Sequence, residues 1–266
     1  MSTGALMFAR YAYPPNALGY CGAGDAEVLL EQASTPDPSR LTANRQDGSL
    51  EWAERARHFE GAWPYLELIA AANRVADPLD GRVVEAYWIG NSLVDAVTPA
   101  QLAALAGSRF RRRGPEGESE AEQSGWAAGP AHHSFHVFAI YPWMRMLRAG
   151  RVEPSLRILD QCRIRWGVVE EVRDDSAIVR SRPLTWDGDG LGHGPPRPET
   201  ARVARGGRGL VRGLRPGDLV ALHWDWVCDR LTDSQRDALN RYSNLSLEAV
   251  NGGATILAAS TSVPAG

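Results

Sequence analysis

A cysteine and a histidine belong to two segments that the sequence predicts to be strands of one small sheet. Cys162 begins an apolar, β-branched run that ends at the turn formers Asp174 and Asp175, and His223 closes the later run that starts at Pro216. A sheet that pairs the two runs brings the thiol and the imidazole together. A soft sulfur beside a borderline nitrogen suits a transition metal, so we expect half of a metal site here. The alternative is a buried small residue and a hydrogen-bonded imidazole.

Three of the six histidines, His132, His133 and His136, fall within five positions. In a helix His132 and His136 share a face, and His133 and His136 are three residues apart, so a chelating pair is geometrically feasible. One of these imidazoles can instead act as a general base, because its ordinary pKa lies near neutral pH. The competing interpretation is a set of histidines that hydrogen-bond in a partly buried interface.

Two further residues are candidates by their surroundings. Cys21 lies in an opening stretch, residues 8–22, whose aromatic and turn-forming residues predict a packed loop; if that loop covers the sheet, Cys21 joins the metal site. Glu60 stands among aromatic residues, where a raised pKa would suit proton transfer, although pairing with one of the many arginines is the simpler role. The catalytic candidates are therefore His133, His136 and Glu60, and the metal candidates are Cys162, His223, His132, His136 and Cys21.

Roughly the last 100 residues resemble the hydrogenase assembly chaperones of the HypC/HupF family. The resemblance lies in Cys-x-x-x-Trp-Gly-Val-Val from Cys162, a strand ending in Ala-Ile-Val-Arg180, Gly-Asp-Leu-Val-Ala-Leu-His223 and a closing helix. That family is a small β-barrel whose Cys-x-x-x-Pro-Gly thiolate carries iron with diatomic ligands to the large subunit of a nickel-iron hydrogenase. The resemblance implies that Cys162 and His223 hold iron for a maturation partner. Here the cysteine is internal, and Trp166 replaces the proline.

The first part of the chain resembles an uncharacterised bacterial family. The phrases that carry this likeness are Tyr-Pro-Pro-Asn, ending at Asn16, and Phe-Glu-Gly-Ala-Trp-Pro-Tyr, ending at Tyr65. This family name implies no activity.

The expected fold class is α+β, with a mainly helical domain over residues 1–153 and a flexible loop at about 107–129. Residues 154–251 are expected to form the small β-barrel and a helix, and residues 252–266 a frayed tail. Two helix starts are predicted by capping patterns, because Thr98 and Thr232 stand at N-cap positions.

Composition excludes several classes of function. A net charge of −3 with 44% hydrophobic residues describes an ordinary globular chain without long-range attraction to nucleic acid or membrane. The sequence contains no lysine, no Gly-x-Ser-x-Gly and no nucleotide fingerprint, which argues against Schiff-base chemistry and a nucleotide cofactor. No apolar run or signal peptide is evident, so we expect a cytoplasmic protein with free thiols.

Three functions follow from these observations. The first is a HypC-like accessory protein for hydrogenase maturation that binds iron through a Cys/His pair, without turnover. The second is a small-molecule or natural-product tailoring enzyme, a lyase, cyclase or hydrolase with a histidine base in an aromatic pocket. The third is a non-catalytic interaction module.

Overall fold

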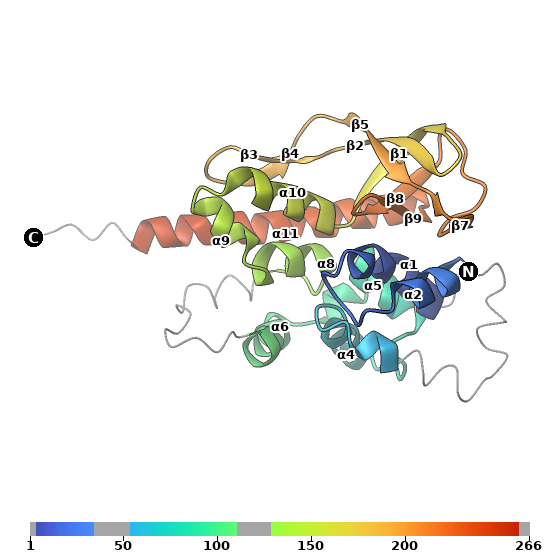
Figure 1. Ribbon diagram of the computed structural model, residues 1–266. Coiled ribbons are helices and arrows are strands. Elements are labelled where there is room, and N and C mark those ends of the chain that lie inside the picture. Colours follow the sequence, from blue (N-terminus) through green and yellow to red (C-terminus); the bar gives the residue numbers. More distant parts are fainter. Residues whose placement is uncertain (1–3, 35–53, 111–128, 261–266) are drawn as a thin grey trace, which may run out of the picture.

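The computed structural model describes residues 4–34, 54–110 and 129–260, and it contains both helices and sheets (Figure 1). The expected α+β class is confirmed. The helices are α1 (Gly4–Ala17), α2 (Ala26–Ala33), α4 (Trp63–Ala72), α5 (Gly81–Trp88), η2 (Val94–Ala96), α6 (Pro99–Leu105), η3 (Ala106–Phe110), α8 (His133–Phe135), η4 (His136–Ile140), α9 (Trp143–Arg148), α10 (Val152–Cys162) and α11 (Asp233–Ser260).

The strands lie between α10 and α11, and five of them close on one another in the order β1-β2-β5-β9-β8. The strands are β1 (Arg165–Val172), β2 (Ser176–Ser181), β3 (Leu184–Trp186), β4 (Leu191–His193), β5 (Arg197–Arg202), β6 (Ala204–Arg205), β7 (Arg208–Gly209), β8 (Leu219–His223) and β9 (Trp226–Arg230). The pairs are antiparallel except β5 with β9, which is parallel. Small aliphatic side chains, among them Val169, Val179 and Val220, form an apolar cluster of these strands.

Helix α1 replaces the packed loop that the sequence predicted over residues 8–22. It includes Pro14 and Pro15, which have no backbone N–H, so the carbonyls of Arg10 and Tyr11 four residues earlier receive no helical hydrogen bond. The prediction was wrong because α1 is buried along most of its length, and tertiary packing outweighs the cost of the prolines.

The largest apolar core joins the helices to the strands. Phe8 of α1 meets Phe59 edge to face with 5.2 Å between ring centroids, and Tyr13 meets Trp226 of β9 in the same way at 5.0 Å. Helix α1 therefore contacts both the other helices and strands β8 and β9. The predicted domain boundary near residue 153 stays a prediction, and α10 runs across it.

Two element boundaries differ from the prediction. The strand expected to begin at Cys162 begins at Arg165, because α10 continues to Cys162 and buries Ser155, Leu159 and Cys162 on one helical face. Helix α11 continues to Ser260, although the sequence predicted an end near residue 251 and a frayed tail from 252.

The side chain of Asn251 anchors this part of α11, since it donates to the carbonyl of Leu191 and accepts from its N–H. The predicted N-caps at Thr98 and Thr232 are confirmed, each with reciprocal bonds to a glutamine. Most of the loop predicted at about 107–129 lies outside the described residues.

The helices within the described ranges are too short or too polar to cross a membrane.

Candidate metal centre

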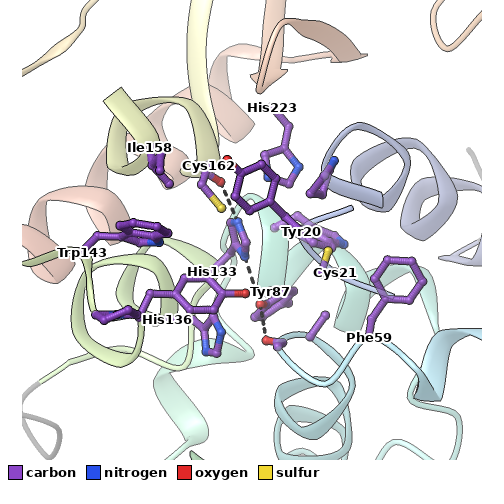
Figure 2. Close-up of a pocket in the computed structure, with 16 residues that line it drawn as sticks. Tyr20, Cys21, Phe59, Tyr87, His133, His136, Trp143, Ile158, Cys162 and His223 are labelled. Atoms are coloured by element: carbon purple, nitrogen blue, oxygen red, sulfur yellow. Dashed lines mark hydrogen bonds between the residues drawn. The ribbon is translucent and has the colours of Figure 1, made fainter. Parts of the chain in front are cut away.

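A cavity of about 210 Å³ lies where α1, α10 and β8 meet the segment from α8 to α9 (Figure 2). It collects side chains from distant parts of the chain, including two of the three cysteines and three histidines. The lining residues are Pro15, Tyr20, Cys21, Phe59, Gly61, Ala62, Tyr87, Trp88, His133, His136, Tyr141, Pro142, Trp143, Ile158, Cys162 and His223.

Three of the lining residues form a donor set for a metal ion. One ligand atom each from His133, Cys162 and His223 lies within 4.8 Å of the other two, and all three residues are buried. Ligand atoms bound to one tetrahedral ion at about 2.0 to 2.3 Å stand roughly 3.3 to 3.8 Å apart. A small inward movement therefore closes this set around an ion. The sequence predicted the Cys162 and His223 members, and the structure brings them together.

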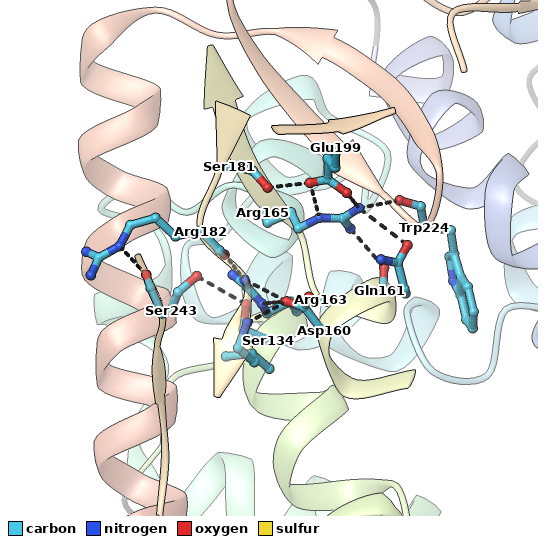
Figure 3. A network of polar contacts seen from close by, with 12 residues as sticks. Ser134, Asp160, Gln161, Arg163, Arg165, Ser181, Arg182, Glu199, Trp224 and Ser243 are labelled. Atoms are coloured by element: carbon cyan, nitrogen blue, oxygen red, sulfur yellow. Dashed lines mark hydrogen bonds and ion pairs between the residues drawn. The ribbon is translucent and has the colours of Figure 1, made fainter. Parts of the chain in front are cut away.

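The end of α10 is fixed by a buried ion pair next to Cys162 (Figure 3). The guanidinium of Arg163 donates to Asp160 at 2.9 Å and to the carbonyl of Arg182 at 2.6 Å, and the Leu184 N–H donates to the same carboxylate at 2.9 Å. Since Arg163 is 3% exposed, these bonds satisfy a charge that has little access to water. The backbone that carries the thiol is thereby held against β3.

A second buried guanidinium, that of Arg165, pairs with Glu199 of β5 at 2.7 and 3.0 Å. The Ser181 hydroxyl donates to the same carboxylate. Burial alone would raise the pKa of Glu199, but the guanidinium and the hydroxyl outweigh burial and hold it below its usual value. The carboxylate is therefore ionised at neutral pH and fixes the start of β1.

Arg165 also connects the two segments that carry Cys162 and His223. It donates to the carbonyl of Trp224 at 2.8 Å, and the Trp224 N–H donates to the carbonyl of Gln161 at 2.7 Å. Trp224 follows His223 and Gln161 precedes Cys162, so this arrangement ties the two ligand-bearing segments to each other. Trp224 has a φ of 53°, a left-handed backbone conformation that residues other than glycine rarely adopt. The two hydrogen bonds help to hold the backbone in this conformation.

Helix α1 sets the orientation of His223. The Nδ1–H of His223 donates to the Tyr11 carbonyl at 2.6 Å, and that carbonyl is available because Pro15 has no N–H to occupy it. With the hydrogen on Nδ1, the lone pair is on Nε2, which is buried and makes no hydrogen bond of normal geometry among the described residues. Burial lowers the pKa of the ring, and the Cys162 backbone lies close enough to offset part of that effect. A histidine that donates through one nitrogen to a carbonyl and leaves the other bare has the arrangement of a metal ligand.

His133 is engaged through both ring nitrogens. Its Nε2 lies 2.9 Å from the Cys162 carbonyl, and its Nδ1 lies 3.0 Å from the Tyr87 hydroxyl, which itself lies 2.7 Å from the Gly61 carbonyl. Burial lowers the pKa of His133 to about 4, so the ring is neutral at pH 7 and carries one hydrogen. His133 must therefore give up one of these contacts before it binds a metal, whereas His223 need not.

The other two histidines of the cluster take different places. His136 lies on the cavity wall, where its Nδ1 contacts the Tyr65 hydroxyl at 3.2 Å. His132 lies outside the cavity: its Nδ1 accepts from the Ser134 N–H, and its ring stacks on Tyr242 of α11. The predicted pairing of His132 with His136 on one helical face does not form, because His132 precedes the helix as its N-cap.

Of the two remaining candidates, Cys21 lines the cavity and Glu60 does not. Cys21 lines the cavity, held by Asn16, whose side-chain amide donates to the Cys21 carbonyl at 2.9 Å. Cys21 is not one of the three residues whose ligand atoms lie within 4.8 Å of one another, so its place in a metal site stays a prediction. Glu60 is exposed and does not line the cavity, although its neighbours Phe59 and Gly61 do.

Burial keeps the donors neutral. It raises the pKa of the Cys162 thiol well above its ordinary value and raises that of Cys21 to about 12. It also lowers the pKa of His223 well below 6.5, helped by the nearby His133. A bare Cys162 is therefore a poor nucleophile, whereas a bound cation would displace its proton and stabilise the thiolate.

Sequence reasoning missed the part played by Tyr11 and Pro15, and it placed His133 among general bases and not with Cys162. A usable signal was present in Tyr-Ala-Tyr-Pro-Pro, since a proline within a helix frees the carbonyl four residues before it.

Comparison with known proteins gives a family but no function. No curated protein matches the chain, and no solved structure matches it. The model of one family, described as a family of unknown function, matches residues 1–256. This match supports the likeness of the chain to an uncharacterised family and does not support the HypC resemblance. The chain belongs to the family of unknown function DUF6390.

Proposed function

We propose that the protein binds a transition-metal ion through the Sγ of Cys162 and the Nε2 of His223, with His133 as a third ligand. The observation that supports this most directly is the buried Nε2 of His223, which has no hydrogen-bond partner among the described residues. It belongs to a ring that the Tyr11 carbonyl holds in place and that offers a ligand atom within 4.8 Å of the Cys162 Sγ. A buried polar atom without a partner is costly, and a metal ion removes that cost.

Our proposal for the role of this site is an accessory protein that carries iron for a maturation partner, as the HypC resemblance implies. Thiolate and imidazole are donors that iron accepts, and the cavity leaves room beside the donors for further small ligands on the metal. Binding by Cys162 releases its proton to solvent, so the affinity should rise with pH.

A tailoring enzyme with a histidine base is less well supported. His133 and His136 line the cavity, but burial lowers their pKa values to about 4 and about 3. A general base works best when its pKa lies near the working pH, so both imidazoles are weak bases at pH 7. The exposed position of Glu60 outside the cavity removes the carboxylate that would have assisted them.

The test is a titration of metal-free protein with Co²⁺, whose thiolate and imidazole complexes absorb visible light. Wild type is compared with Cys162→Ala and His223→Ala, and Cys228→Ala is the matched control. Cys228 is also a buried cysteine, but it does not line the cavity. We expect stoichiometric binding in wild type and control, and a loss of at least tenfold in affinity in the other two variants.

A parallel experiment addresses the iron-carrying role. Protein purified without oxygen is examined by elemental analysis and infrared spectroscopy. About one equivalent of iron with cyanide or carbonyl bands, lost in Cys162→Ala, would support iron carriage; unchanged iron content in that variant would exclude the thiolate as its ligand. A chain that binds Co²⁺ but never iron would retain the metal site and lose the chaperone role.

A further inference from the structure

We propose that the cavity beside Cys162 and His223 binds a neutral organic molecule built around one aromatic ring. Binding of the ring does not depend on the proposed function. Only the placement of the ring beside a metal ion rests on that function. Three properties of the cavity lead to this ligand class: its size, its lack of charge and the arrangement of its aromatic wall.

The size suits a single ring. A dry apolar protein cavity of about 150 Å³ is sufficient to bind benzene. The cavity described here, at about 210 Å³, therefore holds one ring with a short substituent. Tyr20 lies on its wall and is 49% exposed, so the cavity reaches the surface beside this residue.

The wall carries no charge. Among the described residues, the lining set contains no arginine, aspartate or glutamate, and the sequence contains no lysine. The nearby guanidiniums of Arg163 and Arg165 are already paired with Asp160 and Glu199. A carboxylate or phosphate would lose its hydration here without gaining a counter-ion, so the cavity selects against anions.

Aromatic rings surround the space from several elements. Trp143 of α9 and Phe59 lie on different sides of the histidines (Figure 2), and Trp88 of α5 lies within ring contact of both His133 and His223. Such walls favour an aromatic guest through edge-to-face contacts. Polar groups of the lining residues can then meet a substituent: the bare Nε2 of His223 can accept from a hydroxyl, and the Cys162 thiol can donate to a hydroxyl or a carbonyl.

The experiment compares benzyl alcohol with benzoate, which have the same ring and differ in charge. Each is titrated into the full chain after removal of metal by a chelator, and binding is followed by ligand-observed NMR. We expect saturable binding of benzyl alcohol and at least roughly tenfold weaker binding of benzoate, because the ionised group would be buried unpaired.

Cavity-filling variants locate the ligand. Ile158→Trp places an indole in the cavity, and Ala62→Leu narrows the cavity from another segment. Val172→Trp, at an exposed position on β1, is the matched control. At least one folded filling variant should lose benzyl alcohol binding by tenfold or more while the control retains it.

Equal binding of the two compounds, no saturable binding of benzyl alcohol, or binding that both filling variants leave unchanged would overturn this inference. The Co²⁺ titration is read separately. Wild-type protein that binds benzyl alcohol but not Co²⁺ would contradict the proposed metal site and leave the ring site supported. Wild-type protein that binds Co²⁺ but not benzyl alcohol would contradict the ring site and leave the metal site supported.

Discussion

Replacing Pro15 with alanine tests how α1 prepares His223 for a metal. Alanine restores a backbone N–H that can bond to the Tyr11 carbonyl in the ordinary helical pattern, and that carbonyl is the present acceptor of the His223 Nδ1–H. If the new N–H takes the carbonyl, His223 loses the contact that fixes its hydrogen on Nδ1. The ring is then free to carry the hydrogen on Nε2, which removes the lone pair aimed at the site.

The size of the effect follows from the opposing terms. Removing a proline from a helix interior stabilises the folded chain by up to about 3 kcal/mol. The buried Nδ1–H of His223, left without its acceptor, destabilises the folded chain by about 1 to 3 kcal/mol. The free energy of unfolding of Pro15→Ala should therefore stay near that of wild type or rise slightly. Metal affinity should fall by about 10- to 100-fold, the usual consequence of losing the partner of a ligating histidine.

Two measurements on one sample separate these outcomes. Long-range ¹H–¹⁵N NMR spectra report which nitrogen of His223 carries the hydrogen, and a Co²⁺ titration reports the affinity. Pro14→Ala is the matched control, because it makes the same chemical change one residue earlier, and Pro14 does not line the cavity. A Pro15→Ala protein with the hydrogen still on Nδ1 and an affinity within twofold of wild type would refute the reasoning.

Three further predictions concern stability. The histidine cluster is buried neutral with pKa values of about 3 to 4 in the folded chain, against 6.5 when exposed, so the unfolded chain binds more protons and stability falls as pH drops from about 6.5 to 4. Each cluster member should contribute about 1.4 kcal/mol per pH unit to the slope in urea titrations, and a flat profile would contradict this. Glu199→Gln should lower the free energy of unfolding by about 3 kcal/mol by leaving the buried charge of Arg165 without its counter-ion, whereas Glu171→Gln, in an exposed pair, should leave the urea midpoint unchanged. Gly90→Ala should lower the free energy of unfolding by more than about 1 kcal/mol, because φ of Gly90 is 100° and a Cβ there would lie 2.1 Å from the ring of Tyr242. An unchanged urea midpoint would refute that clash.

The sequence carried enough information to predict that Cys162 and His223 lie close together. The apolar pattern before His223 predicted β8 and its end correctly. The pattern near Cys162 placed the start of β1 three residues too early. The apolar positions of α10 and those of β1 follow one another without a turn-forming residue between them. The α+β class followed from patterns of this local kind, which survive in a single sequence.

The rest of the site depends on contacts between distant segments. Nothing in the local sequence of His132 and His133 shows that one faces α11 and the other faces the cavity. Nothing near Tyr11 shows that its carbonyl meets a strand more than two hundred residues later. Helix α1 was missed because two adjacent prolines normally argue against a helix, and its burial against α2, α5, β8 and β9 outweighs them.

The position of Tyr11 against His223 has a consequence for the order of events during synthesis. A nascent chain that has emerged as far as α10 contains His133 and Cys162 but neither β8 nor the carbonyl contact that orients the last donor. The apolar face of α1 meanwhile lacks the strands that cover it, so it depends on the helices alone. Cys162 and His223 are thus brought together only once β8 has been made and packs against α1, so a chain interrupted before β8 lacks one of the two proposed metal ligands.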